Sequence, residues 1–361
     1  MALQCGIIGI QGSGKTTLFN SISGTKAETA QYSDKANLGV IQVPDARLYE
    51  LEKYQKTEKI VHATVNLVDI PGLARGSSGS ESARKFLNEI RNSDAFIHVV
   101  RCFDNPMVPH PDGSVNPIRD VENIEIELQT RDAESVEKKI QRLEKVVKGG
   151  NKEAKLQIDA LIEIKTSLEN FIPVRNIQLS DIAKEAIADL FLLSAKPVLY
   201  VANVDSKSIL SGNSYSKALE DYLKENNSYC LVVGAQLEAE IAELENKEDQ
   251  ELFLADAGLA EPGVNRLVQM AYSMLKLKTF FTVGPKEIKA WTIKEGMTAP
   301  QASGVIHSDL ERGFIRAEVM KYHDFITLGS EAACKEKGKF YIEGKNYIVE
   351  DGDILHIRFN V

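Results

Sequence analysis

The chain has 361 residues, 43% of them hydrophobic and 26% charged, and a formal net charge of -9 at pH 7. This composition is typical of a soluble globular protein of about two or three domains, and no uninterrupted apolar stretch is long enough to span a bilayer. The acidic balance excludes a protein that coats nucleic acid over its whole surface, although a local basic patch is compatible with RNA binding.

The first predicted element is a strand, the apolar run Cys5–Ile8. It is short and has no charged segment before it, so it favours a strand over a signal peptide. The four cysteines are scattered, show no metal-ligand spacing and suit a reducing compartment. We therefore expect a cytoplasmic protein without a membrane anchor.

Residues 9–16 read Gly-Ile-Gln-Gly-Ser-Gly-Lys-Thr, the G-x-x-x-x-G-K-S/T pattern of a phosphate-binding loop, or P-loop. The glycines let backbone N–H groups turn toward a β-phosphate, Lys15 reaches the β- and γ-phosphate oxygens, and Thr16 can ligate Mg²⁺. The helix predicted from Thr17 adds its positive end to the same phosphate. A chance match is the alternative, and the strand-to-helix context argues against it.

A second predicted strand, Val65–Asp69, ends in the D-x-x-G element Asp69-Ile-Pro-Gly72. Asp69 would hold Mg²⁺, and the Gly72 amide would sense the γ-phosphate at the start of a mobile loop. Leu73 follows where Ras-like enzymes carry the glutamine that orients the attacking water. A leucine cannot hydrogen-bond that water, so either catalysis comes from elsewhere or the protein binds nucleotide and barely hydrolyses it.

The third predicted strand, Ala95–Val100, leads into a proline-rich loop, residues 105–117, that contains His110. A histidine in such a loop can reach a γ-phosphate. An ordinary exposed histidine is the alternative, and the residues by themselves favour it.

The predicted strand Val198–Ala202 ends at Asn203-Val204-Asp-Ser206, where G proteins carry N-K-x-D. Because Ser206 replaces the aspartate that pairs with guanine, guanine selectivity is not expected. A further strand leads to residues 234–236, the position of the second base-contacting loop. The complete predicted nucleotide-binding set is Gly12, Ser13, Gly14, Lys15, Thr16, Thr17, Gly72, Asn203, Val204, Gly234, Ala235 and Gln236, with Thr16 and Asp69 as Mg²⁺ ligands.

Residues from about Ile124 to Lys196 are predicted to be helical, because apolar residues recur at steps of three and four on both sides of Gly149-Gly150-Asn151. Two such helices make an antiparallel hairpin. Around its tip, residues 138–155 contain seven lysines and arginines and only two acids. This basic tip indicates contact with RNA phosphates, and a merely solvated helical face is the equally weighted alternative.

From Leu277 onward, short strands such as Thr279–Val283 and Ile354–Phe359 alternate with Gly and Asp turns. They predict a small α+β module. Its histidines and acids lack triad or metal spacing, so an interaction role is expected.

Several runs of the sequence resemble the YchF, or Obg-like ATPase, family of P-loop proteins. They are Asp69-Ile-Pro-Gly-Leu73, His98-Val-Val-Arg-Cys-Phe103, residues 136–145, residues 280–287, Trp291, residues 299–301 and 312–318, and the closing run 351–361. The resemblance covers the whole chain.

The resemblance implies an α/β fold: a P-loop NTPase G domain with an inserted α-helical coiled-coil hairpin and a C-terminal α+β TGS (ubiquitin-like) domain. The implied domains are residues 1–124 and 196–277 for the two parts of the G domain, 125–195 for the hairpin and 278–361 for the TGS domain.

The resemblance also implies that ATP is preferred to GTP and that the chain associates with the ribosome. We expect a slow, Mg²⁺-dependent ATPase that acts as a monomer and docks on the large subunit. In the family a hydrophobic residue replaces the catalytic glutamine, as Leu73 does here, and a loop histidine takes part in hydrolysis. His110 is the matching position. A nucleotide-binding scaffold without appreciable hydrolysis and an Obg-type GTPase are the alternatives.

The sequence departs from the family at two places. The family's N-x-x-E has Ser206 at its last position here, which leaves the adenine contacts to Asn203 and to the backbone of residues 234–236. The segment before Gly39 is short and lacks the family's threonine that completes Mg²⁺ coordination, so Thr25, Thr29 and Ser33 are candidates for that ligand.

Overall fold

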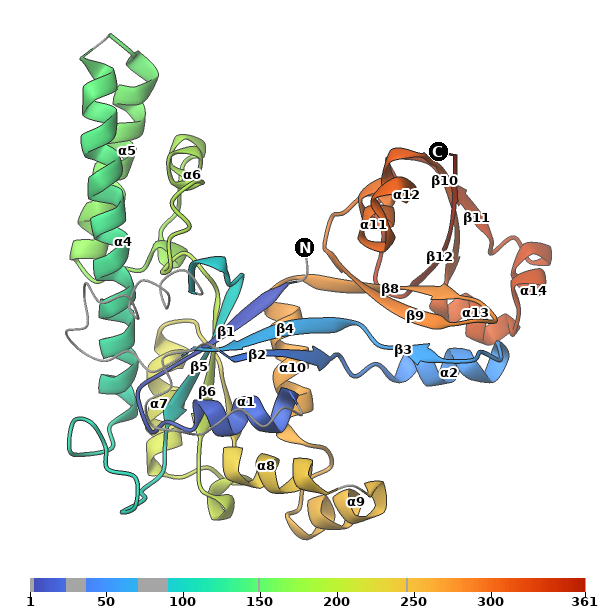
Figure 1. The fold of residues 1–361 in the computed structure, drawn as a ribbon, viewed down its shortest axis with the longest axis horizontal. Coiled ribbons are helices and arrows are strands. Elements are labelled where there is room, and N and C mark those ends of the chain that lie inside the picture. Colours follow the sequence, from blue (N-terminus) through green and yellow to red (C-terminus); the bar gives the residue numbers. More distant parts are fainter. Residues whose placement is uncertain (1–2, 24–36, 71–89, 149, 245, 361) are drawn as a thin grey trace. The chain divides into compact units, whose positions relative to one another are not determined.

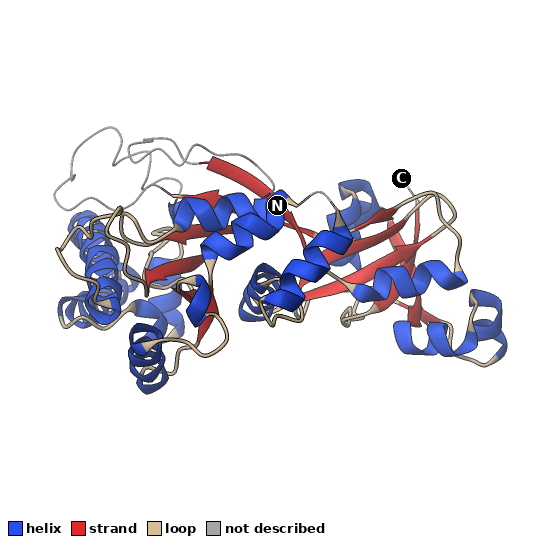
Figure 2. Cartoon of the chain, turned by 90° about the horizontal axis from the view of Figure 1, so that it is seen from below, coloured by secondary structure: helices blue, strands red, loops and turns tan. Residues whose placement is uncertain are grey.

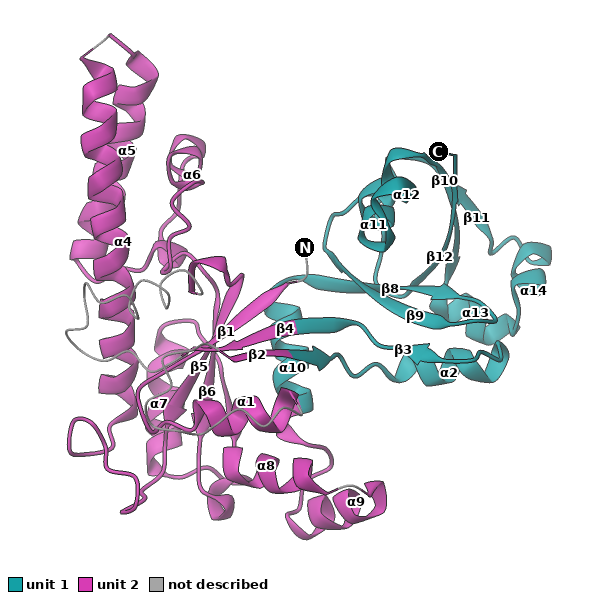
Figure 3. Cartoon of the chain, viewed as in Figure 1, with its two compact units in different colours: residues 1–2, 40–65, 265–361 teal, residues 3–39, 66–264 magenta. Residues whose placement is uncertain are grey.

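The structure is a computed structural model, and it describes residues 3–23, 37–70, 90–148, 150–244 and 246–360. These residues form two compact units, described separately below (Figure 3). Unit 1 contains residues 1–2, 40–65 and 265–361, and unit 2 contains residues 3–39 and 66–264.

Unit 2 is built on a six-stranded sheet of order β2-β4-β1-β5-β6-β7, in which β4, β1, β5, β6 and β7 run parallel. The strands are β1 Gln4–Ile8, β2 Asn37–Gln42, β4 Thr64–Asp69, β5 Ala95–Arg101, β6 Val198–Asn203 and β7 Cys230–Val233. Every residue of β5 is buried, as a continuous apolar run predicts for a central parallel strand. The strands predicted from these runs are confirmed.

Helices lie on both sides of this sheet (Figure 1), where α1 packs against α8 and α4 against α7. Their bounds are α1 Lys15–Ser23, α7 Ser214–Glu225, α8 Ala235–Glu243 and α9 Lys247–Asp256, with short 3-10 turns η1 Val174–Asn176 and η2 Ser206–Ser208. Helix α10, Gly263–Met274, begins at the end of unit 2 and lies mostly in unit 1. The carboxyl ends of the parallel strands are therefore free to present loops, which is where open α/β sheets bind ligands.

The longest helix, α4 (Pro117–Val147), begins at Pro117 and not near Ile124 as predicted. Asn116 caps it by accepting from the Arg119 N–H, and Pro117 occupies the first turn, where no backbone donor is needed. The predicted boundary between residues 124 and 125 therefore falls inside one continuous helix.

The two halves of α4 pack against different partners. Its first half contributes Ile124 and Leu128 to the core on the sheet. Its second half runs beside α5 (Lys152–Glu169), as Figure 1 shows, and packs with α5 and α6 (Asp181–Ile187) through Val136 and Ile140. The helical segment predicted here is thus confirmed as a pair of packed helices, with Asn151 capping the second.

Asp132 fixes the middle of α4 to the end of the helical segment. Its buried carboxylate accepts from the Leu193 N–H, the Ser194 N–H and the Ser194 hydroxyl at 2.6–2.8 Å. These three bonds satisfy a carboxylate that burial would otherwise penalise.

Unit 1 contains a second six-stranded sheet, of order β11-β10-β12-β8-β9-β3. Its strands are β3 Ile60–Val61, β8 Leu277–Val283, β9 Ile288–Lys294, β10 Phe314–Lys321, β11 Tyr341–Glu343 and β12 Asp353–Phe359. Its helices are α2 Ala46–Tyr54, α11 Ala299–Ile306, α12 Ser308–Arg312, α13 Tyr322–Leu328 and α14 Glu331–Glu336. Figure 2 shows strands and helices mixed within this unit, as an α+β module requires.

The compact units divide the chain differently from the predicted domains: residues 125–195 stay within unit 2, and residues 265–277 and 40–65 group with residues 278–361. The physical reason is long-range pairing, because Ile60 and Val61 of β3 pair in parallel with Ile288 and Lys289 of β9. Arg47 of α2 also pairs with Asp351 at 2.7 Å.

Among the helices of the described ranges, none combines the length and the apolar character that a membrane crossing needs. All four cysteines are free, and Cys5, Cys102 and Cys334 are buried.

Candidate functional site: a P-loop and its surroundings

The predicted P-loop connects β1 to α1 at the carboxyl edge of the unit 2 sheet. Gly14 has φ +94°, and a Cβ there would lie 2.2 Å from Asn203 Nδ2. Only glycine fits, since the position has both a left-handed backbone and a side chain pressed against it. Thr17 follows in the first turn of α1 and is partly buried.

Lys15 is buried at the start of α1, where Nζ donates to the carbonyls of Gly9 at 3.0 Å and Ile10 at 2.7 Å. Two of its three ammonium hydrogens are thereby used, and the third is available to an anion. Burial lowers the pKa of Lys15 to about 8, while the carboxylate of Asp69 acts in the opposite direction. The lysine is thus a buried cation at the phosphate loop.

Thr16 and Asp69 meet beside this lysine. Thr16 Oγ1 donates to Asp69 Oδ2 at 2.8 Å, while Asp69 Oδ1 is buried without a hydrogen-bond partner in the described residues. A hydroxyl and a carboxylate with a spare oxygen are the hard donors that Mg²⁺ takes. The two residues brought together here therefore fit a magnesium ion.

Asn203 lies at the end of β6 and ties two loops together. Its buried side chain donates from Nδ2 to the Ser13 carbonyl at 2.8 Å and accepts at Oδ1 from the Ala235 N–H at 2.9 Å. The structure thus brings the predicted residues Asn203, Ser13 and Ala235 into direct contact. Sequence reasoning gave Asn203 only a contact with the base, and its bridging role was missed.

The other predicted base-side residues lie in different settings. Val204 is 3% exposed and packs into the hydrophobic core, so its side chain does not face a ligand. Gly234 precedes α8 as its N-cap, and the exposed Gln236 bonds to Glu240 within that helix. Ser206 begins η2, and Asp205 caps that turn by accepting from the Lys207 N–H.

A cavity of about 410 Å³ opens beside these loops, at the carboxyl ends of β5 and β6. Its lining is polar apart from two aromatic rings, and consists of Phe103, Asp104, Asp205, Ser206, Lys207, Asn213, Ser214 and Tyr215. An aromatic face with polar groups around it is a suitable environment for a planar base.

The loop that carries His110 packs against the P-loop. A Cβ added at Gly12 would lie 3.0 Å from Val108 Cγ1 and 4.0 Å from the Pro109 carbonyl oxygen. The two residues that precede His110 therefore lie next to Gly12 of the phosphate loop, with little room for a side chain between them.

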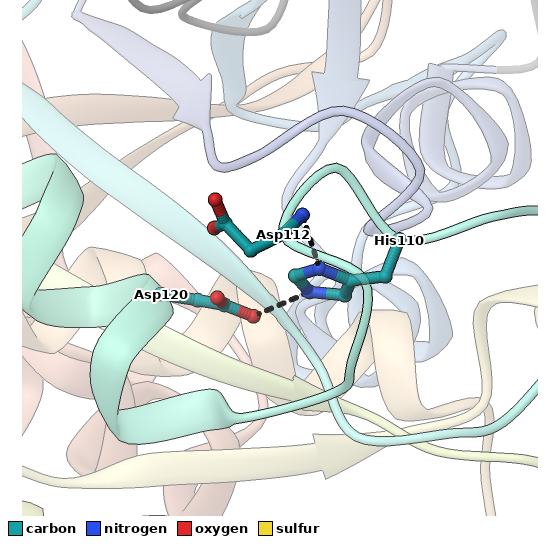
Figure 4. A group of neighbouring side chains, drawn as sticks. All are labelled: His110, Asp112 and Asp120. Atoms are coloured by element: carbon teal, nitrogen blue, oxygen red, sulfur yellow. Dashed lines mark hydrogen bonds and ion pairs between the residues drawn. The ribbon is translucent and has the colours of Figure 1, made fainter.

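The His110 side chain itself is turned onto acidic neighbours (Figure 4). Its Nε2 lies 2.9 Å from Asp120 Oδ2, and its Nδ1 accepts from the Asp112 N–H at 3.1 Å. Nδ1 is thus the unprotonated nitrogen and Nε2–H donates to Asp120. With both ring nitrogens engaged and a side chain only 3% exposed, His110 needs to leave Asp120 before it can act on a phosphate.

Several predicted positions lie outside the described residues. They are Gly72, Leu73 and the candidates for the third Mg²⁺ ligand, Thr25, Thr29 and Ser33.

One residue that sequence reasoning left without a role is Arg101, the last residue of β5. It is 2% exposed, and its Nη1 has no hydrogen-bond partner in the described residues. The only signal in the sequence is a charged residue that ends an apolar strand at the ligand edge of the sheet.

A parallel sheet with a glycine loop between β1 and α1, a buried lysine and a threonine–aspartate pair define a P-loop nucleotide-binding protein of the GTPase fold. Residues 4–152 match the family model described as 50S ribosome-binding GTPase. Residues 277–360 match that of the YchF GTPase carboxyl-terminal region, described as a protein of unknown function (DUF933).

Relatives and one solved structure match over the full length. The Ribosome-binding ATPase YchF of Bacillus subtilis (strain 168) is 42% identical and that of Haemophilus influenzae 43%, each covering 100% of both chains. The structure of the Schizosaccharomyces pombe YchF GTPase is 31% identical, with a TM-score of 0.87 over 99% of this chain and 97% of that one. The chain belongs to the YchF family, and the resemblance drawn from its motifs is confirmed.

Proposed function

We propose that this chain binds ATP with Mg²⁺, hydrolyses it slowly, and uses its nucleotide state to control docking on the ribosome. The observation that carries the proposal is the Thr16–Asp69 pair beside the buried ammonium of Lys15 on a P-loop. The relatives named Ribosome-binding ATPase YchF and the match to a 50S ribosome-binding GTPase model support the partner, with the large subunit as its docking site.

Each residue at the phosphate end has a defined task in this proposal. Lys15 pairs with the β- and γ-phosphates, and the backbone N–H groups of Gly12, Ser13 and Gly14 surround the β-phosphate. Thr16 and Asp69 hold Mg²⁺, which supplies charge neutralisation to the phosphates when it is bound. Gly72 is proposed to contact the γ-phosphate.

ATP is favoured over GTP because the base loop offers no free carboxylate at the position that reads guanine. Ser206 stands there, and the carboxylate of Asp205 is engaged in capping η2 through Lys207 and Ser208. The adenine is proposed to lie in the cavity next to Asn203 and the backbone of residues 234–236. An Obg-type GTPase would require a bidentate acceptor in this loop.

The test of this function is a side-by-side measurement of ATP and GTP affinity and turnover. We expect tighter ATP binding and slow ATP turnover that changes when ribosomes are added. A strong preference for GTP would contradict the ATP assignment.

A second candidate is a nucleotide-binding scaffold with negligible hydrolysis. It is favoured by one observation, the engagement of both His110 ring nitrogens by Asp112 and Asp120. Single-turnover hydrolysis of bound ATP, with and without ribosomes, separates the two candidates.

His110→Ala is expected to lower ATP turnover by on the order of 100-fold at equal ATP occupancy, because the imidazole is proposed to position the attacking water. ATP affinity should stay near that of the wild type. The control is His323→Ala, which removes an exposed histidine in unit 1 and should change neither quantity. Unchanged turnover in His110→Ala would remove this residue from the mechanism.

We interpret α4 and α5 as the coiled-coil hairpin of the family and residues 278–361 as its TGS domain, in a cytoplasmic monomer. The hairpin is proposed to contact RNA at its tip. Six of its basic side chains there are exposed: Lys138, Arg142, Lys145, Lys148, Lys152 and Lys155. Lys139 is instead paired with Asp189.

Charge reversal at Lys138, Lys145 and Lys152 is expected to weaken ribosome binding. It should also reduce the slope of the logarithm of the binding constant against the logarithm of salt concentration, by about one unit for each lysine that pairs with a phosphate in the wild type. The matched control reverses three exposed lysines elsewhere in unit 2. These are Lys217, Lys224 and Lys247. Ribosome binding that survives the tip reversal with the same salt dependence would refute the proposed RNA contact.

A further inference from the structure

Arg101 is a buried arginine that forms no ion pair with any acidic residue in the described part of the chain. It ends β5 and lies opposite Asn203 of β6 in the parallel register, so both side chains sit at the carboxyl edge of the sheet. Within the described residues, no carboxylate lies at ion-pair distance from its guanidinium. An arginine that is buried without a counter-charge is costly, and buried charges in proteins are as a rule paired.

Two of the three guanidinium nitrogens bind the loop that follows β5. Nε donates to the Phe103 carbonyl at 3.2 Å, and Nη2 donates to the carbonyls of Val108 at 2.9 Å and Asn105 at 3.5 Å. The side chain also lies over the Phe103 ring, with the Cζ atom 4.8 Å from the ring centroid. Two nitrogens thus hold the segment that runs into His110.

The remaining nitrogen faces the P-loop. A Cβ added at Gly12 would lie 3.4 Å from Arg101 Nη1, and this nitrogen is buried with no hydrogen-bond partner in the described part of the chain. Burial also lowers the pKa of Arg101, with Asp104 and Asp120 acting in the opposite direction. A strong donor without an acceptor therefore points at the loop whose amides bind phosphate.

We propose that Arg101 contacts the polyphosphate of the bound nucleotide through Nη1, while Nε and Nη2 keep hold of the loop that leads to His110. The contact supplies a counter-charge that no described residue places at ion-pair distance from the guanidinium. Because one planar group then holds both phosphate and loop, phosphate binding sets the position of the His110 loop. The inference deepens the proposed function and rests on it.

The test compares Arg101→Gln with the wild type in binding ADP, a slowly hydrolysed ATP analogue and adenosine. Glutamine can still donate to the loop carbonyls but has no charge. We expect the affinity for the two polyphosphates to fall on the order of 10- to 100-fold, and adenosine binding to be unchanged. The control is Arg175→Gln, which removes a partly buried guanidinium, paired with Glu125 at 2.6 Å, and should leave all three affinities unaltered.

A second measurement uses the unmodified protein. The side-chain nitrogen signals of Arg101, assigned with Arg101→Lys, should shift on addition of ADP and stay in place with adenosine. Unchanged ADP affinity in Arg101→Gln, an equal decrease for ADP and adenosine, or no shift of the Arg101 signals with ADP would each overturn the proposal. If the wild type binds neither ADP nor ATP, the proposed function itself fails, and that result needs no variant.

Discussion

Lys15→Met is expected to weaken ATP binding by on the order of 100-fold, because it removes charge-assisted hydrogen bonds to two phosphates. Methionine has a similar length and fills the same buried space, so the ligand-free fold should persist. The loss of two hydrogen bonds to the Gly9 and Ile10 carbonyls lowers the stability of the ligand-free protein, whereas the loss of a buried charge raises it, so the two effects offset each other. Isothermal titration with ATP and ADP, together with thermal unfolding without nucleotide, checks both parts.

The same lysine predicts how ATP affinity depends on pH. Its amine must be protonated to pair with phosphate, and its pKa in the ligand-free protein is lowered to about 8. Affinity should therefore be full below pH 8 and fall as pH rises through it, by about tenfold between pH 7 and pH 9.

The free energy of unfolding should depend on pH in the opposite direction to ATP affinity. Because the pKa of Lys15 is lowered in the folded state, the unfolded chain binds more protons between about pH 8 and its ordinary pKa of 10.5. The contribution of Lys15 to the free energy of unfolding thus rises with pH across that window, and falls as pH drops through 8. The difference in unfolding free energy between wild type and Lys15→Met isolates this contribution.

One other lysine, Lys196, has a pKa lowered by burial to about 8 and is a necessary control. Its Nζ donates to the carbonyls of Ile90, Arg91 and Ser93. Lys196→Arg keeps a cation beneath those carbonyls and should retain the decline of ATP affinity above pH 8. An ATP affinity that does not change with pH in the wild type would contradict the role given to Lys15. So would a pH dependence of ATP affinity that disappears in Lys196→Arg.

The strands of unit 2 and its P-loop were predictable because each is determined by residues that are adjacent in the sequence. A run such as Ala95–Val100 is apolar throughout only if both faces of the strand are covered, and all of β5 is buried. The glycine pattern of residues 9–16 likewise indicates a backbone conformation, at those same residues, that only glycine adopts without strain.

The features that the sequence did not reveal depend on partners far along the chain. The two-residue strand Ile60–Val61 is too short for a periodic signal, and its pairing with Ile288–Lys289 brings residues 40–65 into the carboxyl-terminal unit. The orientation of His110 is set by Asp120, which lies on α4 and is 1% exposed. No spacing rule links the two.

The early start of α4 was missed for a different reason. Pro117 was counted with the proline-rich loop before it, whereas proline in the first turn after an asparagine cap begins a helix. A local signal was therefore present in Asn116-Pro117, and the apolar periodicity that begins near Ile124 obscured it.

Asn203→Ala is expected to destabilise the nucleotide-free protein by about 3 kcal/mol, since it leaves the Ser13 carbonyl and the Ala235 N–H buried and unpaired. A residue that only contacts the base would instead leave the ligand-free protein unaffected. The prediction therefore separates the bridging role of Asn203 from a role in base recognition alone.

Asn203→Asp is a sharper version of the same test. The aspartate can still accept from Ala235, but it places an oxygen against the Ser13 carbonyl where Nδ2 donated at 2.8 Å. We expect it to destabilise the protein at least as much as alanine, because it adds a buried repulsion. Ser206→Ala, at an exposed position in the same loop, is the control and should change stability by less than about 0.5 kcal/mol.

The measurement should follow unit 2 specifically. Trp291, the single tryptophan of the chain, lies in unit 1, so its fluorescence does not report on the P-loop. Hydrogen exchange of the Ala235 amide is the direct observable, because its protection depends on the bond to Asn203 Oδ1. Full protection of this amide in Asn203→Ala would show that the bridge is dispensable, and would return Asn203 to a role in base recognition alone.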